Sequence, residues 1–179
     1  NDVNKDLMNL YKDIKKFPEK LIEEHEKIIK IFEKKDYSES YYSIREKFNG
    51  LNQELKRIKK YSKIERSAAL MLLNKTCFNG LYRVNSKGLF NVPKGSYENP
   101  SYVKADLIYS VSKILPNLKN IKSKSYLDIE YKKNDLVYFD PPYDPINETS
   151  SFTDYSGKFG KDEQRELYDK FNKLDAMGA

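Results

Sequence analysis

Apolar side chains recur at intervals of three and four residues through the first third of the chain, a pattern typical of amphipathic helices. The first set comprises Leu7, Leu10, Tyr11 and Ile14. A second helix is expected from Pro18, because proline suits the first turn of a helix. A third is expected from Ser38 to about residue 50, and a fourth from residue 62 or 63. The first 60 residues are therefore predicted to form helical hairpins.

The pattern changes after residue 79. Two short runs, residues 81–84 and 89–92, flank the turn sequence Asn85-Ser86-Lys87-Gly88, which predicts a β-hairpin over about residues 81–92. Further along, the spacing predicts a helix over 103–115, strands over 120–126 and 135–139, a loop over 140–160 and a helix over 161–175. Strands and helices that alternate in this way indicate the α/β class.

The second of these strands ends at Asp140-Pro141-Pro142-Tyr143. Two prolines cannot continue a sheet ladder, so the chain must turn there. A carboxylate, a carbonyl and an aromatic ring are thus predicted at the carboxyl end of a strand, where open α/β sheets bind ligands. Such a site would suit a planar substrate with an amino group, such as a nucleobase. The tetrapeptide alone is equally compatible with a loop in which Tyr143 packs on the surface.

Composition narrows the partners only slightly. The 179 residues include 33 Lys and Arg against 27 Asp and Glu, a net charge of +6 that favours polyanionic partners. The single cysteine, Cys77, excludes an intrachain disulfide and a cysteine metal cluster, and no metal is expected. The lone histidine, His25, lies among Glu and Lys and is predicted to be a surface residue. Without a membrane-length apolar stretch or a signal-peptide pattern, we expect a cytoplasmic protein.

Polar and basic residues gather around the predicted hairpin. The cations are Lys75, Arg83, Lys87 and Lys94, and they surround Phe78, Asn79, Asn85 and Asn91. Arg can pair with guanine and Asn with adenine in the major groove of DNA, and a two-stranded ribbon fits that groove. Considered alone, the hairpin fits a lysine-decorated surface better.

Several motifs in order carry a family resemblance. They are Leu-Asn-Lys-Thr-Cys-Phe-Asn-Gly-Leu-Tyr-Arg-Val-Asn at 73–85, Gly-Leu-Phe-Asn-Val-Pro at 88–93, the tetrapeptide at 140–143 and Phe-Thr-Asp-Tyr at 152–155. Residues 2–7 and 41–49 fit the same pattern. The chain resembles the Dam-type (α-class, D12) DNA adenine-N6 methyltransferases from end to end. The resemblance implies a partial Rossmann-like methyltransferase fold, with residues 1–16 and 119–179 in the catalytic domain and 17–118 in a mainly helical target-recognition domain.

The resemblance also implies a mechanism in which the target adenine is flipped out of the duplex. Tyr143 would stack on the flipped base, while the Asp140 carboxylate and the Pro141 carbonyl accept the two hydrogens of adenine N6. Pro142 completes the predicted catalytic set. Acceptors in fixed positions would let the nitrogen become more tetrahedral and attack the methyl group of S-adenosylmethionine. Neither a covalent intermediate nor a metal is required.

For DNA recognition, the family pattern implies Arg83 on a guanine, Leu81 and Pro93 against neighbouring bases, and Phe78 in the gap left by the flipped adenine. The remaining implied contacts with double-stranded DNA are polar or ionic, from Asn79, Asn85, Asn91, Arg45, Lys75 and Lys94. Lys94 would replace a basic residue that is often found where this chain has Ser96. Members with this hairpin commonly methylate GATC, which is the expected target.

The cofactor residues implied by the resemblance are Asp2, Val3, Ser125, Tyr126 and Asp140. The family's Gly-rich cofactor loop would precede Asn1, so we expect an internal segment of a longer bacterial or phage enzyme that binds S-adenosylmethionine weakly alone. Two alternatives remain open: a non-catalytic DNA-binding fragment, and an amino-methyltransferase acting on RNA or protein amides. Neither the oligomeric state nor membership of a restriction-modification system follows from the sequence.

Overall fold

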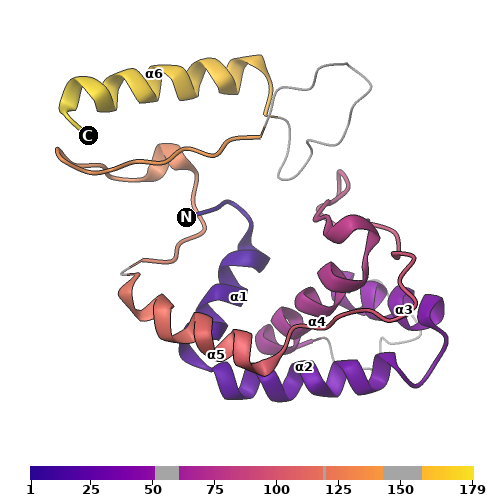
Figure 1. Ribbon diagram of the computed structural model, residues 1–179. Helices are drawn as coiled ribbons and strands as arrows, with labels where there is room; N and C mark the ends of the chain where they lie inside the picture. The colour runs from indigo at the N-terminus through magenta and orange to yellow at the C-terminus, as the bar shows by residue number, and fades with distance from the viewer. Residues whose placement is uncertain (51–60, 119, 143–158) are drawn as a thin grey trace.

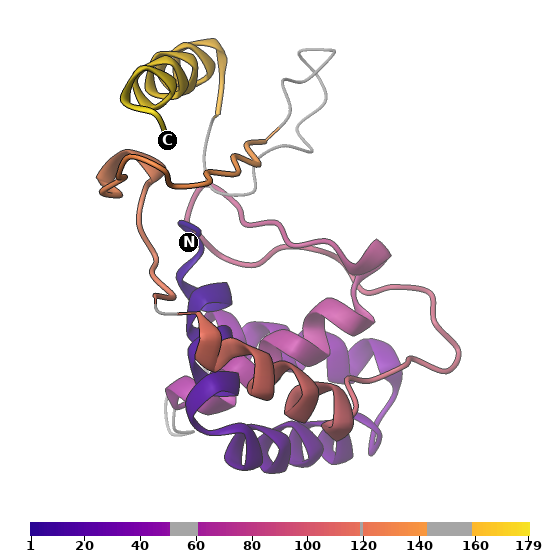
Figure 2. The same cartoon turned by 60° about the vertical axis from the view of Figure 1, so that its left-hand side comes forward.

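The computed structural model describes residues 1–50, 61–118, 120–142 and 159–179. Helices α1 (Lys5–Lys16) to α5 (Ala105–Ile114) form one part of the molecule, and α6 (Lys161–Met177) lies at the other end beside an extended segment, residues 120–142 (Figure 1). A second view shows the same segment between α6 and the helical part (Figure 2). Within the described residues, none of the helices is long and apolar enough to cross a membrane.

The helices agree closely with the periodicity of the sequence. Their bounds are α1 Lys5–Lys16, α2 Pro18–Phe32, α3 Tyr37–Asn49, α4 Lys63–Thr76, α5 Ala105–Ile114 and α6 Lys161–Met177. Short 3₁₀ turns follow at η2 Phe78–Gly80, η3 Leu115–Asn117 and η4 Tyr126–Asp128. The six helices predicted from the sequence are therefore confirmed, with ends that differ by about two residues, as helix ends commonly do.

Local capping explains where several helices begin and end. The Asn4 side chain accepts a hydrogen bond from the backbone N–H of Leu7 at the start of α1, 3.0 Å away. Ser62 and Glu65 form a reciprocal capping box at the start of α4. Helix α3 ends at Gly50, whose φ of 69° is in the left-handed region that glycine adopts without strain.

Helix α4 lies at the centre of the helical part and packs against α1, α2 and α3. Its residues 67–73 are all buried, so it has no polar face over that stretch. Two polar contacts join it to α1. Arg66 pairs with both carboxylate oxygens of Asp6 at 2.7 Å, and the Ser67 hydroxyl donates to Asp13 at 2.6 Å. These contacts fix α1, and the N-terminal residues before it, on α4.

His25 is buried, so the prediction of a surface residue is wrong. Only 2% of it is exposed, and its Nδ1 lies 3.1 Å from the carbonyl oxygen of Ala68 on α4. The reason is its register in α2, because Leu21, Ile28 and Phe32 are buried on the same side of the helix. The charged neighbours of His25 in sequence point elsewhere on the helix.

The described residues contain no β-strand, which corrects three predictions. The chain does reverse at the predicted hairpin, where the Gly88 N–H donates to the Asn85 carbonyl at 2.8 Å. However, within the reversal only Val84 and Phe90 pair as an antiparallel bridge. Residues 120–126 and 135–139 form no ladder, because a strand exists only through bonds to a neighbour and no described segment runs alongside in register. Leu136 in the second segment is fully exposed.

The N-terminal residues join the two parts of the molecule. The Asp2 N–H donates to the Lys122 carbonyl at 3.3 Å, and the Ser123 hydroxyl donates to the Val3 carbonyl at 3.0 Å. Residues before α1 therefore lie against the extended segment 120–142. The proposed domain boundaries near residues 16 and 118 stay a prediction.

Candidate active site and DNA-reading surface

The turn at residues 139–142 is positioned by aromatic packing and by α6. The Phe139 ring lies edge-on to Tyr126, with centroids 6.2 Å apart, and 6.3 Å from the Tyr131 ring. On the other side of the turn, Gln164 of α6 donates its side-chain N–H to the Pro142 carbonyl at 3.1 Å. The Asp140 side chain is exposed between these two anchors. A carboxylate is thus presented to solvent from a backbone that is fixed on both sides.

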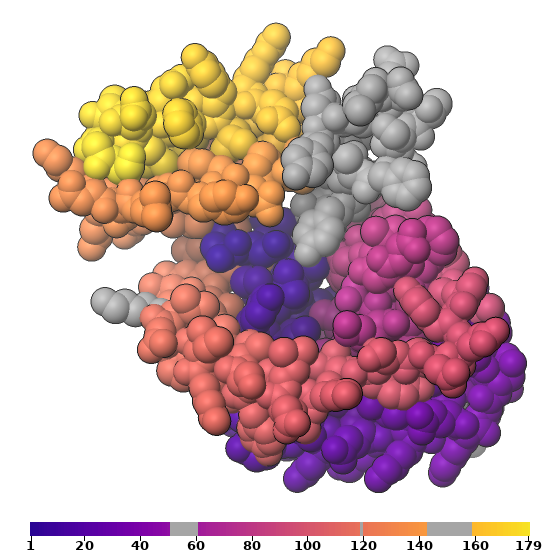
Figure 3. Space-filling view, viewed as in Figure 1, coloured from indigo at the N-terminus to yellow at the C-terminus, as the bar shows by residue number. Residues whose placement is uncertain are grey.

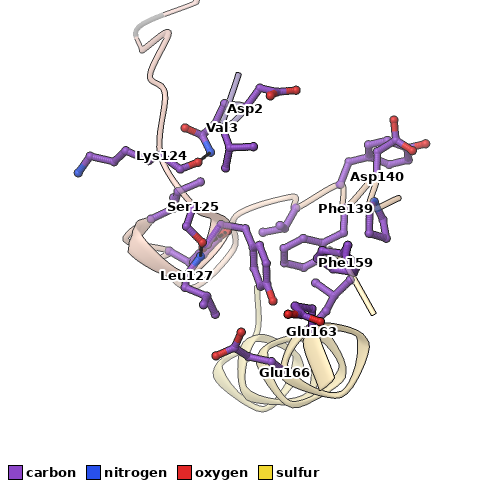
Figure 4. A pocket seen from close by; sticks show the side chains of 18 of the residues that line it. Asp2, Val3, Lys124, Ser125, Leu127, Phe139, Asp140, Phe159, Glu163 and Glu166 are labelled. Carbon is purple, nitrogen blue, oxygen red and sulfur yellow. Dashed lines mark hydrogen bonds between the residues drawn. The ribbon is translucent and has the colours of Figure 1, made fainter. Parts of the chain in front are cut away.

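A cavity of about 930 Å³ adjoins this turn. The residues predicted to bind cofactor all line it, and they come from three separate segments: Asp2, Val3, Ser125, Tyr126 and Asp140. Pro141 and Pro142 line it as well. Figure 4 shows the N-terminal segment, the residues directly before η4, and α6 around the cavity. In the space-filling view, the N-terminal residues lie in the hollow between the helical part and the segment beside α6 (Figure 3).

Two of the polar residues in the cavity are fixed by local hydrogen bonds. Asp2 accepts the backbone N–H of Asn4 at 2.6 Å through one carboxylate oxygen. Ser125 caps η4 by accepting the N–H of Leu127 at 3.2 Å. Each of these bonds leaves capacity on the side chain. The Asp2 carboxylate has further lone pairs that can accept toward the cavity, and the Ser125 hydroxyl can still donate its hydrogen.

Helix α6 contributes two carboxylates that the sequence did not point to, Glu163 and Glu166. They are three residues apart and therefore lie on one face of α6. The backbone N–H groups of Glu163 itself and Gly160 lower the pKa of Glu163, which favours its ionised form. Burial, and then the Glu166 carboxylate, raise the pKa of Tyr126 in the cavity wall. The sequence signal that could have pointed to Glu163 and Glu166 is their three-residue spacing on the final predicted helix.

The predicted DNA-reading residues lie mainly around η2. Phe78 is 46% exposed and Leu81 is 37% exposed, although both are apolar. The Phe78 N–H donates to the Pro93 carbonyl at 2.9 Å, which brings Pro93 beside Phe78. Asn79 has a φ of 51° and is exposed at the tip of η2. The structure therefore gathers Phe78, Asn79, Leu81 and Pro93 into one exposed surface.

Arg83 and Asn91 contact each other. Arg83 Nε donates to Asn91 Oδ1 at 2.9 Å, a bond that does not use the Nη groups of the guanidinium. Asn85 has a local role, since its Oδ1 accepts the N–H groups of Lys87 at 2.9 Å and Leu89 at 3.1 Å. Asn85 therefore shapes the turn, and Asn91 orients Arg83.

The three predicted phosphate-binding cations have different surroundings. Arg45 Nη1 donates to the Val92 carbonyl at 3.0 Å, and its guanidinium lies over the Tyr42 ring. Lys94 Nζ lies 5.5 Å from the centroid of the Tyr37 ring. Lys75 is exposed in the last turn of α4. Lys75 and Lys94 adjoin the surface around η2, whereas Arg45 is engaged with backbone.

Two predicted elements fall where the structure gives no placement. Tyr143 and the Phe-Thr-Asp-Tyr sequence at 152–155 lie outside the described residues. Across the described ranges, no group of three or more His, Cys, Asp or Glu side chains could hold a metal ion.

Comparison with known proteins decides which family this arrangement represents. The model of the D12 class N6 adenine-specific DNA methyltransferases matches residues 1–178. The chain belongs to this family. It is 42% identical over 185 residues to the Type II methyltransferase M.MjaIII of Methanocaldococcus jannaschii, a match that covers all of this chain and 62% of the relative.

Two further relatives have similar coverage. The Type II methyltransferase M1.LlaDCHI of Lactococcus lactis subsp. cremoris is 41% identical over 99% of this chain and 61% of its own length. A DNA adenine methylase of Vibrio cholerae is 33% identical over 94% of this chain and 57% of its own length. This D12-class chain thus spans about three fifths of the relatives that it matches.

Proposed function

We propose that this chain is the target-recognition and catalytic-turn segment of an enzyme that methylates adenine N6 at a specific site in double-stranded DNA. The observation that carries the proposal is the cavity beside residues 139–142. There, residues from the N-terminus, from the segment before η4 and from the Asp-Pro-Pro turn converge. All three segments match the family pattern, and membership of the family makes adenine the expected base.

The chain's own groups would act on the amino group of the base. The Asp140 carboxylate and the Pro141 carbonyl are hydrogen-bond acceptors, and adenine N6 carries two hydrogens to donate. Accepting both draws the nitrogen lone pair out of conjugation with the ring, so the nitrogen becomes a better nucleophile. The fixed backbone on both sides of the turn supports this role, because preorganised groups lose little energy to rearrangement in the transition state.

The cavity suits S-adenosylmethionine, which supplies the methyl group. Its volume of about 930 Å³ lies in the range of about 300–1,000 Å³ typical of small-molecule sites. Asp2 offers carboxylate oxygen to a ribose, and the rings around Tyr126 offer apolar surface to a purine. Asp2, Val3, Ser125, Tyr126 and Asp140 would hold this cofactor. We further propose that residues 120–142 and α6 are part of a Rossmann-like catalytic domain.

The surface around η2 would read the DNA, with GATC as the proposed target. Exposed apolar side chains at Phe78 and Leu81 support this role, since they can contact bases once the adenine is flipped out. Arg83 would contact a guanine through its Nη groups. A bidentate contact of this kind discriminates against a wrong base by about 1–3 kcal/mol. The proposed reaction belongs to a bacterial or phage cytoplasmic enzyme.

The experiment is transfer of labelled methyl groups from S-adenosylmethionine to duplexes with and without GATC, using the full-length protein. Asp140→Ala should lower transfer by about 100-fold or more and leave DNA binding largely unchanged. Asp106→Ala, an exposed carboxylate on α5 away from the cavity, is the matched control. Normal activity in Asp140→Ala would refute the proposed chemistry.

Arg83→Lys tests recognition separately from chemistry. Lysine keeps the charge but loses the fork of N–H groups. We therefore expect methylation of GATC to fall toward the rate on sequences in which the guanine is replaced. If RNA or protein amides were methylated in place of duplex DNA, the alternative substrate class would be correct.

A further inference from the structure

Residues 89–92 are the second extended segment of the chain reversal and are called the limb below. Helix α3 contacts the limb where a sheet would have a neighbouring strand. The side chain of Asn49 donates through Nδ2 to the Phe90 carbonyl at 2.9 Å. Its Oδ1 accepts the Phe90 N–H, also at 2.9 Å. These are the two backbone bonds that a residue in an antiparallel ladder receives from its partner strand. One amide side chain therefore satisfies both backbone groups of Phe90.

The next backbone group on the same edge is satisfied from α3 as well. The Val92 carbonyl accepts the Tyr41 hydroxyl at 2.9 Å and Arg45 Nη1 at 3.0 Å. A carbonyl oxygen has two lone pairs, so these two donors use its full capacity. Phe90 and Val92 share this edge because backbone groups in an extended chain alternate in direction from one residue to the next.

The spacing of the helix matches the spacing of the limb. Tyr41, Arg45 and Asn49 follow each other at intervals of four and so lie on one face of α3. Four helical residues advance about 6 Å, and two residues of extended chain advance about 6.6 Å. Since Asn49 contacts Phe90 while Arg45 contacts Val92, helix and limb run antiparallel. The match explains why both contacts form together.

The opposite edge of the limb faces Arg83. The Asn91 N–H donates to the Arg83 carbonyl at 3.0 Å, and the Asn91 side chain accepts from Arg83 Nε at 2.9 Å. The limb thus contacts α3 on one edge and Arg83 on the other. A shift of the limb along α3 would move Arg83 with it.

Burial shows that this arrangement is firmly packed. Phe90 is 2% exposed, Val92 is 1% exposed and Tyr41 is fully buried. The Phe90 ring lies edge-on to Phe48 of α3, with centroids 6.1 Å apart. The limb is therefore fixed by apolar contacts, and the polar bonds from α3 set its register.

We propose that Asn49 is a positioning residue for sequence recognition, which sets the register of residues 89–92 and through them the direction of Arg83. This inference rests on the proposed function, because Arg83 must read a base for its direction to matter. Asn49 does not touch DNA in this proposal. Arg45 and Tyr41 assist it from the same face of α3.

The test compares the full-length wild-type protein with Asn49→Ala and Asn49→Asp, and with Asn117→Ala as an exposed control. Single-turnover methyl transfer is measured on a GATC duplex and on duplexes with each guanine replaced. Asn49→Ala should reduce the ratio of these rates by about tenfold or more, while Asn117→Ala leaves it unchanged. Asn49→Asp retains the acceptor for the Phe90 N–H but places a carboxylate oxygen, which cannot donate, against the Phe90 carbonyl, so it should also reduce the ratio. Hydrogen exchange at the Phe90 amide should accelerate in Asn49→Ala.

The outcomes separate the inference from the function beneath it. If wild-type protein methylates none of the duplexes, the proposed function fails. If wild type discriminates and a folded Asn49 variant discriminates equally well, the inference is overturned. A uniform fall in rate on every duplex also overturns it, because that result indicates a role in folding alone. If Asn49→Ala does not fold, Asn49→Asp decides between these outcomes in the same assay.

Discussion

The free energy of unfolding should decrease as the pH decreases because of one buried residue, His25. Its Nδ1 lies against the Ala68 carbonyl, which can only accept, so the neutral ring carries its hydrogen on Nδ1. Its Nε2 is buried without a hydrogen-bond partner among the described residues. Burial lowers the pKa of His25, and the smaller opposing effects of Ala68 and Glu26 do not reverse it. A second proton would place an unpaired charged donor in the core.

The sign and size follow from linkage. The ordinary pKa of His25 is 6.5, and the folded value is lower. Above pH 6.5 neither state of His25 is protonated, so it adds no pH dependence. Below that pH the unfolded chain binds a proton that the folded chain does not, and the free energy of unfolding falls. The slope is at most about 1.4 kcal/mol per pH unit, and it ends at the folded pKa.

Urea unfolding between about pH 8 and pH 5 measures this slope. The comparison is between the full-length protein and His25→Asn, which cannot titrate but can still donate an amide N–H toward Ala68. Other titrating groups contribute equally to both proteins and cancel in the difference. We expect the two stabilities to converge as the pH falls below 6.5. Parallel curves across the whole range would refute the reasoning.

Three further changes should have distinct effects. Arg66→Ala removes both bonds to the partly buried Asp6 together with the bond to the Phe48 carbonyl, and should lower the free energy of unfolding by about 2 kcal/mol in urea titrations. Gly88→Ala should cost about 1 kcal/mol, since its φ of 72° is left-handed although the site has room for a methyl group; Gly88→Asn should cost less. Asn91→Ala should leave stability nearly unchanged yet weaken the guanine preference proposed for Arg83 in the methylation assay. If Asn91→Ala discriminated between GATC and guanine-replaced duplexes as strongly as wild type does, the orienting role would be contradicted.

Helices were predictable because their signal is local. Each apolar stripe recurs within a few residues, and caps such as Ser62 with Glu65 are encoded beside the helix they begin. His25 shows the limit of this reasoning. Its immediate neighbours in sequence are charged, but its position relative to Leu21 and Ile28 places it on the buried stripe. Spacing along the helix, and not local polarity, decided its burial.

Strands and site contacts depended on distant partners and were harder to predict. The motif residues at both ends of the chain do line one cavity, because family patterns carry information about the folded arrangement. Glu163 and Glu166 belong to that cavity but to none of the motifs considered. Asn49 was missed for another reason. Its bonds to Phe90 join residues 41 positions apart, and no sequence spacing encodes such a pairing.

The α1–α4 contact links the two proposed activities in one structural unit. Asp2 of the cavity lies three residues before α1, and Phe78 of the proposed DNA-reading surface lies two residues after α4. The Arg66–Asp6 pair fixes one of these helices on the other. Loosening that pair should therefore displace the cavity wall and the reading surface together, and weaken both cofactor and DNA binding. Changing Asn49 acts on residues 89–92 and through them on Arg83, and by the proposal above it should alter the choice of sequence alone. The two perturbations thus separate assembly of the site from recognition by it.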